Sequence, residues 1–222
     1  MKNNIVSIDL DEIQNSFLYE ESLSKLRTNI QFLDKNLRVL LFTSSIPGEG
    51  KTEVSFQLSV SLSKIGKKVL YIDGDMRNSK FAAQCSVKGK VNGISQFLSG
   101  EASEQEIIHT TNIENLDVVF SGAPVKNPSE LLYDYALDEF IAEQKKIYDF
   151  VIIDSPSLSN ISDAAIIGRC VDGAVIVIRS GKVGKTAVNR VKLQLEKVNC
   201  KILGVVLNRT EMKKYKQNRD RI

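Results

Sequence analysis

The sequence predicts one α/β domain in which helices cover both faces of a doubly wound, mainly parallel sheet. Two observations support this prediction. Short runs of Val, Ile and Leu recur along the 222 residues without apolar–polar alternation, which is typical of strands buried on both faces. Stretches with helical spacing of apolar residues lie between these runs. The length is that of one domain, because domains commonly hold about 100–200 residues.

The apolar runs predict six strands, and most of the stretches between them predict helices. The expected strands are Arg38–Thr43, Lys68–Asp73, Leu116–Phe120, Asp149–Asp154, Gly173–Arg179 and Ile202–Asn208. The expected helices between strands are Lys51–Ile65, Pro128–Lys145 and Gly184–Val198. A further helix, Glu20–Leu33, precedes the first strand and carries Leu23, Leu26, Ile30 and Leu33 on one stripe. That stripe either packs on the domain or offers a face to a partner.

We therefore divide the chain into three parts. Residues 1–37 form an N-terminal segment with a packing or oligomer-contact helix, residues 38–208 form the α/β domain, and residues 209–222 form a tail. The tail carries six Lys or Arg residues against two acidic residues, so its net charge is +4. Such a tail is compatible with acidic lipid headgroups, nucleic acid or an acidic partner, and equally with a solvated terminus.

Composition excludes several classes of protein. No apolar run approaches the ~20 residues of a membrane span, and the first residues do not resemble a signal peptide, so a cytoplasmic protein is expected. Cys85, Cys170 and Cys200 lie far apart and lack the spacing of a metal or redox site. His109 is the only histidine, which excludes a His-rich metal site.

The segment SIPGEGKT, which begins at Ser45, carries the most specific chemical signal. It follows an expected strand, opens an expected helix and matches the phosphate-binding pattern G-x-x-x-x-G-K-[ST], except that Ser45 replaces the first glycine. Backbone N–H groups of such a loop surround phosphate oxygens, and the helix N-terminus adds its positive dipole. The expected nucleotide-binding residues are Pro47, Gly48, Glu49, Gly50, Lys51 and Thr52.

A second segment, Gly181–Thr186 (GKVGKT), also follows an expected strand and precedes an expected helix. A phosphate loop needs a later strand that ends in a carboxylate, because this group organises the metal. The only strand expected after Thr186 ends in Asn208, whereas two carboxylate-ended strands follow Thr52. We therefore assign phosphate binding to the first segment.

Those two strands carry the acidic residues of the predicted site. VLYIDGDMR places Asp73 and Asp75 at the end of one strand, and VIIDSP places Asp154 at the end of another. In a chain that already has a phosphate loop, these three carboxylates are expected to converge on Mg²⁺ and the γ-phosphate. Arg77 either forms a local salt bridge or contacts the transferred phosphate.

The loop SSIPGEGKT, the motif VLYIDGDMR and the strand VIIDSP resemble the Walker A, A′ and B motifs of the bacterial tyrosine kinases. These are cytoplasmic kinases associated with capsule and exopolysaccharide production, and they are unrelated to eukaryotic protein kinases. KLRTNIQF, NPSELL and GVVLNR agree as well, so the likeness runs from about Glu20 to Arg209.

The resemblance implies a P-loop NTPase fold and an ATP-dependent protein-tyrosine (auto)kinase that regulates capsular and exopolysaccharide synthesis and export. It implies that Lys51 and Thr52 bind the nucleotide phosphates and Mg²⁺, and that Asp154 positions the metal. Asp73 would bind metal or activate the tyrosine hydroxyl, with Asp75 in support. Asn208 would contact the adenine.

The resemblance also implies partners. A membrane-spanning activator would bind the kinase through its cytoplasmic tail at the inner face of the plasma membrane, copies of the kinase would assemble into rings, and a protein-tyrosine phosphatase would oppose it. No nucleic-acid partner is expected. The family usually carries Glu-x-x-Arg-x-x-Arg as a subunit contact, but here Glu21, Ser24 and Arg27 stand at those positions, so the first arginine is missing.

The C-terminal tyrosine cluster of the family is also absent, since the tail holds only Tyr215. Either Tyr215 is the sole acceptor, or the acceptor tail is missing from this chain, or the protein acts mainly on other substrates. Two other functions are alternatives. A switch ATPase of the partition or cell-division type carries an additional lysine where this chain has Ile46, and a weakly catalytic nucleotide-binding regulator has support only from the missing tyrosines.

Overall fold

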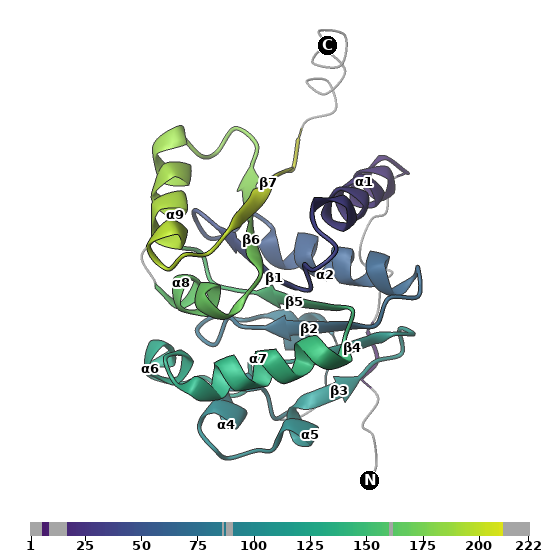
Figure 1. Cartoon of the computed structure of the whole chain (residues 1–222), viewed down its shortest axis with the longest axis vertical. Helices are drawn as coiled ribbons and strands as arrows, with labels where there is room; N and C mark the ends of the chain where they lie inside the picture. Colours follow the sequence, from purple (N-terminus) through teal and green to yellow (C-terminus); the bar gives the residue numbers. More distant parts are fainter. Residues whose placement is uncertain (1–5, 9–16, 86, 88–90, 160–161, 211–222) are drawn as a thin grey trace, which may run out of the picture.

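The strands of the computed structural model form one mixed sheet (Figure 1). The structure describes residues 6–8, 17–85, 87, 91–159 and 162–210. Within them the strand order is β3-β4-β2-β5-β1-β6-β7, and every neighbouring pair is parallel except β3 with β4. The strands are β1 (Val39–Ser44), β2 (Val69–Asp73), β3 (Ile108–Thr110), β4 (Leu116–Val119), β5 (Phe150–Asp154), β6 (Gly173–Arg179) and β7 (Ile202–Asn208).

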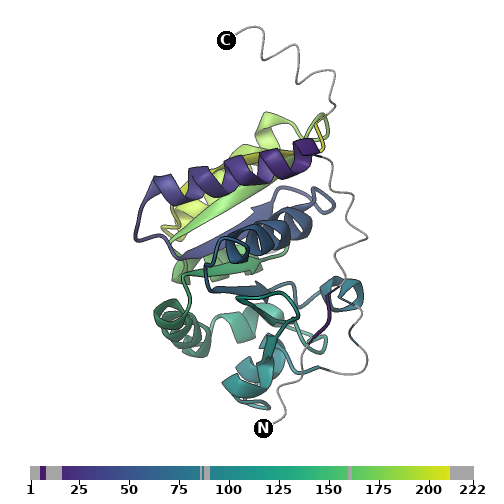
Figure 2. The ribbon, with the colours of Figure 1, turned by 90° about the vertical axis from the view of Figure 1, so that its right-hand side faces the viewer.

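Helices cover both faces of this sheet (Figures 1 and 2). Neighbouring residues of one strand enter different cores: Leu41 packs with α7, α8 and α9, whereas Phe42 packs with α1, α2 and α3. The helices are α1 (Phe17–Leu33), α2 (Lys51–Ser63), α3 (Phe81–Gln84), α4 (Ile94–Leu98), α5 (Glu104–Ile107), α6 (Pro128–Leu132), α7 (Tyr135–Ile147), α8 (Asp163–Ile167) and α9 (Lys185–Lys197). The predicted doubly wound α/β fold is confirmed.

All six predicted strands are present, with ends that differ by at most one residue. The predicted helix Pro128–Lys145 is wrong in one respect, because it is two helices, α6 and α7. Asp134 separates them and caps α7 by accepting a hydrogen bond from the Ala136 N–H at 3.2 Å. The prediction missed β3, whose three residues include His109 and do not form an apolar run.

The N-terminal helix packs on its own domain along part of its stripe. Ile30 is 2% exposed, and the Arg27 guanidinium donates to the Ser61 carbonyl and hydroxyl oxygens at 3.1 and 2.9 Å. Further along, Phe32 and Leu33 are 84% and 51% exposed. The stripe therefore packs on the domain at Ile30, whereas Phe32 and Leu33 at the C-terminal end of the helix are exposed. A contact of this end with a partner stays a prediction.

The three cysteines and the single histidine lie in the following environments. Cys85, Cys170 and Cys200 are free thiols, two of them buried. The His109 ring lies beside Phe120 and its Nε2 is 3.0 Å from the Asn92 carbonyl oxygen, in a structural position. No helix in the described ranges combines the length and the apolar character that a bilayer span needs.

Candidate active site

The carboxyl ends of β1, β2 and β5 meet at one edge of the sheet, because these strands are parallel neighbours. Asp73 at the end of β2 is the register partner of Asp154 at the end of β5, and both side chains are almost fully buried. The loop that follows β1 leads into α2 at this same edge. The topology thus brings the predicted phosphate loop and two of the three predicted acidic residues together.

Glycine is required in the phosphate loop for its backbone shape. Gly48 and Gly50 have φ angles of +81° and +86°, a left-handed conformation that side chains with a Cβ rarely adopt. A Cβ at Gly50 would lie 2.1 Å from the Asn208 side-chain nitrogen, so the loop and the end of β7 could not approach so closely. The first helical residue after Gly50 is Lys51, which places the N-terminus of α2 at the loop.

Glu49 holds the loop from inside. Its Oε2 accepts hydrogen bonds from the Ser45 N–H at 2.7 Å, the Ser45 hydroxyl at 2.8 Å and the Ile46 N–H at 2.9 Å. Its Oε1 accepts from the Arg179 N–H on β6 at 3.0 Å. The carboxylate is therefore directed into the protein. Ser45, which replaces the first glycine of the pattern, is one of its donors.

Lys51, Thr52 and Asp154 form the central contact of the site. The Thr52 hydroxyl donates to Asp154 Oδ2 at 2.5 Å, and Lys51 Nζ lies 3.9 Å from Asp154 Oδ1. That Oδ1 is buried and accepts no hydrogen bond from the part of the chain that the structure describes. Burial raises the pKa of Asp154 to about 7, although the Lys51 charge and the Thr52 hydroxyl act to lower it. The carboxylate thus has one oxygen available for a further ligand.

Asp73 and Asp75 belong to one hydrogen-bonded loop. Asp73 Oδ1 accepts from the Asp75 N–H at 3.2 Å, and the Ser79 hydroxyl donates to Asp73 Oδ2. Burial raises the pKa of Asp73 to about 6, and the hydrogen bond from Ser79 is the main opposing effect. Asp75 is half-buried, and its Oδ1 accepts from the Arg77 and Asn78 N–H groups at 3.2 and 3.0 Å.

Arg77 forms the local salt bridge. Its Nε donates to Asp163 Oδ2 at 2.7 Å, and its Nη2 donates to Asp163 Oδ1 at 3.1 Å. Asp163 opens α8, so this contact joins two segments far apart in the chain. The salt bridge that the sequence left open for Arg77 is therefore present, and a contact of Arg77 with the transferred phosphate stays a prediction.

Two cavities lie beside these groups. The larger, of about 520 Å³, is lined by Gly48, Gly50, Lys51 and Thr52, together with residues that the sequence analysis did not single out as site residues: Ile8, Tyr19, Glu53, Phe56, Gln57, Phe81, Gln84, Cys85 and Arg209. The smaller, of about 190 Å³, is lined by Lys51, Thr52, Asp73, Asp75, Asn78, Ser79, Lys80, Phe81, Gln84 and Asp154. Of the predicted nucleotide-binding residues, Pro47, Glu49 and Asn208 line neither cavity.

Asn208 lies against the phosphate loop. Its Nδ2 donates to the Glu49 carbonyl oxygen at 3.0 Å, and its Oδ1 accepts from the Arg209 N–H at 2.8 Å. A contact with adenine, which the family resemblance implies for Asn208, stays a prediction. Tyr215 lies outside the described residues.

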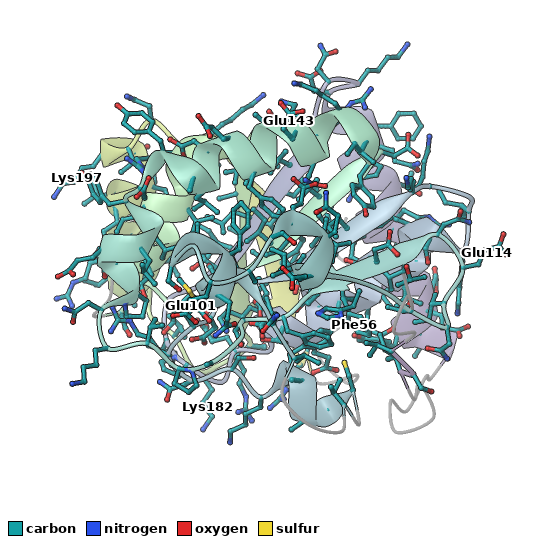
Figure 3. The ribbon with its side chains drawn as sticks, turned by 90° about the horizontal axis from the view of Figure 1, so that it is seen from below. Phe56, Glu101, Glu114, Glu143, Lys182 and Lys197 are labelled. Carbon is teal, nitrogen blue, oxygen red and sulfur yellow. The ribbon has the colours of Figure 1, made fainter. Side chains whose placement is uncertain are left out.

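The second candidate loop lacks this environment. It joins β6 to α9, and Lys182, Lys185 and Thr186 are exposed. In Figure 3 the Lys182 side chain extends from the surface. Neither cavity beside the acidic residues is lined by any residue of this loop. The choice of the first loop therefore agrees with the geometry.

The site fits a magnesium ion that is held jointly by protein and nucleotide. Across the described residues, no group of three His, Cys, Asp or Glu side chains could enclose a metal. Mg²⁺ commonly uses one or two carboxylates and completes its octahedron with water and phosphate oxygens. The Thr52 hydroxyl oxygen and Asp154 Oδ1, which has no hydrogen-bond partner among the described residues, are oxygen ligands suited to Mg²⁺.

The chain is similar to proteins of known family and structure. The model of the AAA domain family matches residues 37–208. The chain is 40% identical over 190 residues to the tyrosine-protein kinase CpsD of Streptococcus agalactiae, which covers 86% of this chain and 83% of that protein. Among solved structures, the chimerical protein CapA2B2 has a TM-score of 0.82 and 33% identity, over 93% of this chain and 94% of that one.

A less similar structure is the septum site-determining protein MinD of Pyrococcus horikoshii OT3, solved with Mg-ADP. Its TM-score is 0.65 and its identity is 27%, over 79% of this chain and 72% of that one. The likeness to a cell-division protein is therefore weaker and covers less of the chain than the likeness to CapA2B2.

Proposed function

Because the chain belongs to the capsule-associated bacterial tyrosine-protein kinases, within the AAA domain family, we propose that the edge of its sheet transfers the ATP γ-phosphate to a tyrosine hydroxyl. The observation that carries this proposal is the cluster of Lys51, Thr52 and Asp154, with Asp73 directly opposite Asp154. In this role Lys51, Asp73, Asp75 and Asp154 are the catalytic residues.

Each group has a task that follows from its position. Lys51 and the N-terminus of α2 bind and orient the β- and γ-phosphates, since both bring positive charge to the loop. Thr52 and Asp154, already bonded to each other, hold the metal. When bound, Mg²⁺ neutralises charge on the phosphate oxygens. The proposal assigns ATP and Mg²⁺ as cofactors on this basis.

Asp73 accepts the proton of the tyrosine hydroxyl in this proposal. A general base works well when its pKa lies near the operating pH, because it is then ionised and still basic. Burial raises the pKa of Asp73 to about 6, so the carboxylate is mostly ionised at pH 7. Asp75 supports the base by holding its N–H against Asp73 Oδ1.

We propose Tyr215 as the acceptor within this chain, because it is the only tyrosine of the tail. The test is intact-mass measurement and peptide mapping of concentrated protein after incubation with Mg-ATP. One phosphate on the peptide that contains Tyr215, absent from the Tyr215→Phe variant, is the expected result. ATP turnover without phosphotyrosine would contradict autophosphorylation, and a tyrosine-rich peptide added in trans would then show whether the transfer chemistry itself is present.

We also propose that copies of the chain assemble through α1. The support is its open end, where Phe32 is 84% exposed, whereas Arg27 of the family contact motif is bonded to Ser61 and to the Ser24 hydroxyl. Native mass spectrometry of Phe32→Ser is expected to show more monomer than the wild type. Tyr135→Ser is the matched control, since Tyr135 is an 80% exposed aromatic residue on α7. An unchanged distribution in Phe32→Ser would exclude this contact.

The cellular setting is proposed from the family. A membrane-spanning activator would bind the kinase through its cytoplasmic tail and keep it at the inner face of the plasma membrane. A protein-tyrosine phosphatase would reverse the modification. Co-sedimentation of the full chain with vesicles that contain or lack the activator tests this placement, and binding to the bare vesicles alone would contradict it.

A further inference from the structure

We infer that Asp163 and Ser129 are positioning residues, which hold the loop of Asp73 and Asp75 in place through Arg77. The inference rests on the proposed function, because it concerns the geometry of the proposed catalytic carboxylates. It assigns a role to a buried ion pair that the transfer chemistry itself does not use.

The contact is a closed network of three side chains. Arg77 binds both oxygens of Asp163, at 2.7 and 3.1 Å, and its Nη2 also donates to the Ser129 hydroxyl oxygen at 3.0 Å. The Ser129 hydroxyl donates in turn to Asp163 Oδ1 at 2.6 Å. A two-bond contact between guanidinium and carboxylate fixes direction as well as distance. The network therefore defines where the Arg77 side chain lies.

The three residues come from separate segments of the chain. Arg77 follows β2, Ser129 lies in α6 and Asp163 is the first residue of α8. The segment that leads into α8 follows β5, which ends at Asp154. The network thus ties the loop after one catalytic strand to the helix that follows the other catalytic strand.

Bonds inside the loop carry this restraint to the catalytic carboxylates. The Arg77 N–H donates to Asp75 Oδ1, and the Asp75 N–H donates to Asp73 Oδ1. A displacement of Arg77 therefore changes the position of Asp75 and removes a hydrogen bond that holds Asp73. The loop between β2 and α3 contains turns but no helix or strand. These side-chain bonds add to two backbone bonds, from the Gly74 N–H to the Asp154 carbonyl oxygen at 2.8 Å and from the Ser79 N–H to the Asp75 carbonyl oxygen at 3.2 Å.

Burial makes the network sensitive to substitution. The Asp163 side chain is 1% exposed, whereas that of Arg77 is 29% exposed. A buried carboxylate that loses its cation is strongly unfavourable, so the pair separates only if the surrounding segments rearrange. Lysine at position 77 would keep the charge but lose the planar fork that binds both oxygens.

The test compares Arg77→Lys, Asp163→Asn and Ser129→Ala with the wild type, using the full chain. The first readout is amide hydrogen exchange of the peptide that covers residues 73–80, measured without nucleotide. Exchange about tenfold faster in Arg77→Lys and Asp163→Asn is expected, because the loop opens more often once the network is broken. The second readout is phosphoryl transfer, for which we expect kcat to fall by up to about 10²-fold while the KM for ATP stays within about threefold.

Asp172→Asn is the matched control. Asp172, like Asp163, is paired with a cationic side chain, here Lys145. It also accepts from the Arg38 and Val39 N–H groups near the start of β1, at the opposite edge of the sheet. This variant is expected to leave the exchange of residues 73–80 and the transfer rate unchanged. If Asp163→Asn does not fold, Arg77→Lys and Ser129→Ala decide the question, since both variants keep the buried Asp163 carboxylate.

The outcomes separate the inference from the proposed function. Unchanged exchange at 73–80 and unchanged kcat in folded Arg77→Lys and Asp163→Asn would overturn the inference. If the wild type transfers no phosphate to its own tyrosine or to an added tyrosine-rich peptide, the proposed function fails instead, and the exchange result still reports whether the network orders the loop. A rise in KM without a fall in kcat would also overturn a positioning role, because it would point to nucleotide binding.

Discussion

Asp73 and Asp154 stand directly opposite each other at the carboxyl edge of the sheet, as register partners on the parallel strands β2 and β5. Burial raises the pKa of both carboxyl groups, and the charge of Asp73 raises the pKa of Asp154 further. Lys51 is the cation closest to this pair among the described contacts, at 3.9 Å from Asp154. The site thus holds two carboxyl groups whose ionised forms are disfavoured by burial, and they face the phosphate loop. A bound cation would stabilise the ionised form, and a carboxylate with a raised pKa can accept a proton.

Replacing Lys51 by Met should abolish phosphotyrosine formation. The variant removes the charge that binds the phosphates, and loss of a single electrostatic stabiliser of this kind costs about 10²–10³-fold in rate. Labelling with Mg-ATP, followed by phosphotyrosine detection, measures the effect. Lys185→Met is the matched control, because Lys185 occupies the same place in the second glycine-containing loop and is exposed. Equal labelling of Lys51→Met and wild type would refute the assignment of this loop.

Asp73→Asn should reduce transfer far more than ATP binding. The amide keeps the size of the side chain but cannot take the tyrosine proton, and loss of a general base costs about 10²–10⁴-fold. Transfer by the wild type should also fall as the pH drops through about 6, since the pKa of Asp73 is raised to about 6 and the protonated acid is not a base. Rate–pH profiles and nucleotide titrations of both proteins measure this. A variant with wild-type kcat would rule out Asp73 as the base.

Asp154→Asn should stabilise the nucleotide-free protein at pH 8 while it abolishes transfer. The pKa of Asp154 is raised to about 7, so the native state prefers the neutral acid, and stability from this group is lost as pH rises from about 4 through 7. Because an amide does not ionise, the variant should have a free energy of unfolding at pH 8 that is about 1–3 kcal/mol higher than that of the wild type. Thermal unfolding at pH 5 and pH 8 measures it.

Asp172→Asn should change the stability in the opposite direction in the same thermal unfolding assay. Burial raises the pKa of Asp172, but hydrogen bonds from Lys145 and from the Val39 and Arg38 N–H groups outweigh it and lower the pKa overall. Its charge is therefore stabilising at neutral pH, and the asparagine variant should be less stable there. If Asp154→Asn is also less stable than the wild type at pH 8, the buried ionised carboxylate of Asp154 does not destabilise the fold, and the prediction is wrong.

Glu49→Ala should weaken nucleotide binding by about tenfold or more, because each lost hydrogen bond to a charged group is worth about 1.5–3 kcal/mol and four converge on this carboxylate. Binding of a fluorescent ATP analogue measures the change. Glu114→Ala is the control, since Glu114 is an exposed glutamate that lines neither cavity of the site. Wild-type affinity in Glu49→Ala would mean that the loop keeps its shape without this residue.

Much of this protein follows from local sequence. Uninterrupted apolar runs such as Gly173–Arg179 are typical of strands buried on both faces, and both ends of that strand are as predicted. The similar run Ile202–Asn208 is also a strand, but Val205 and Leu207 on it are exposed. Gly48, Gly50 and the lysine after them already define a phosphate loop, since its shape depends on backbone conformations available to few residues. Because parallel strands end at one edge, Asp73 and Asp154 also had to meet the loop.

Only the tertiary structure decided where the remaining polar groups find partners. Glu49 lies inside the phosphate motif, yet its carboxylate is bonded to Ser45 and to Arg179, which is 130 residues away. Arg77 lies beside the catalytic acids, yet it is paired with Asp163 across 86 residues. A side chain forms hydrogen bonds with the groups that packing brings to within about 3 Å of it. Those groups are far away in the sequence, so the local sequence cannot predict them.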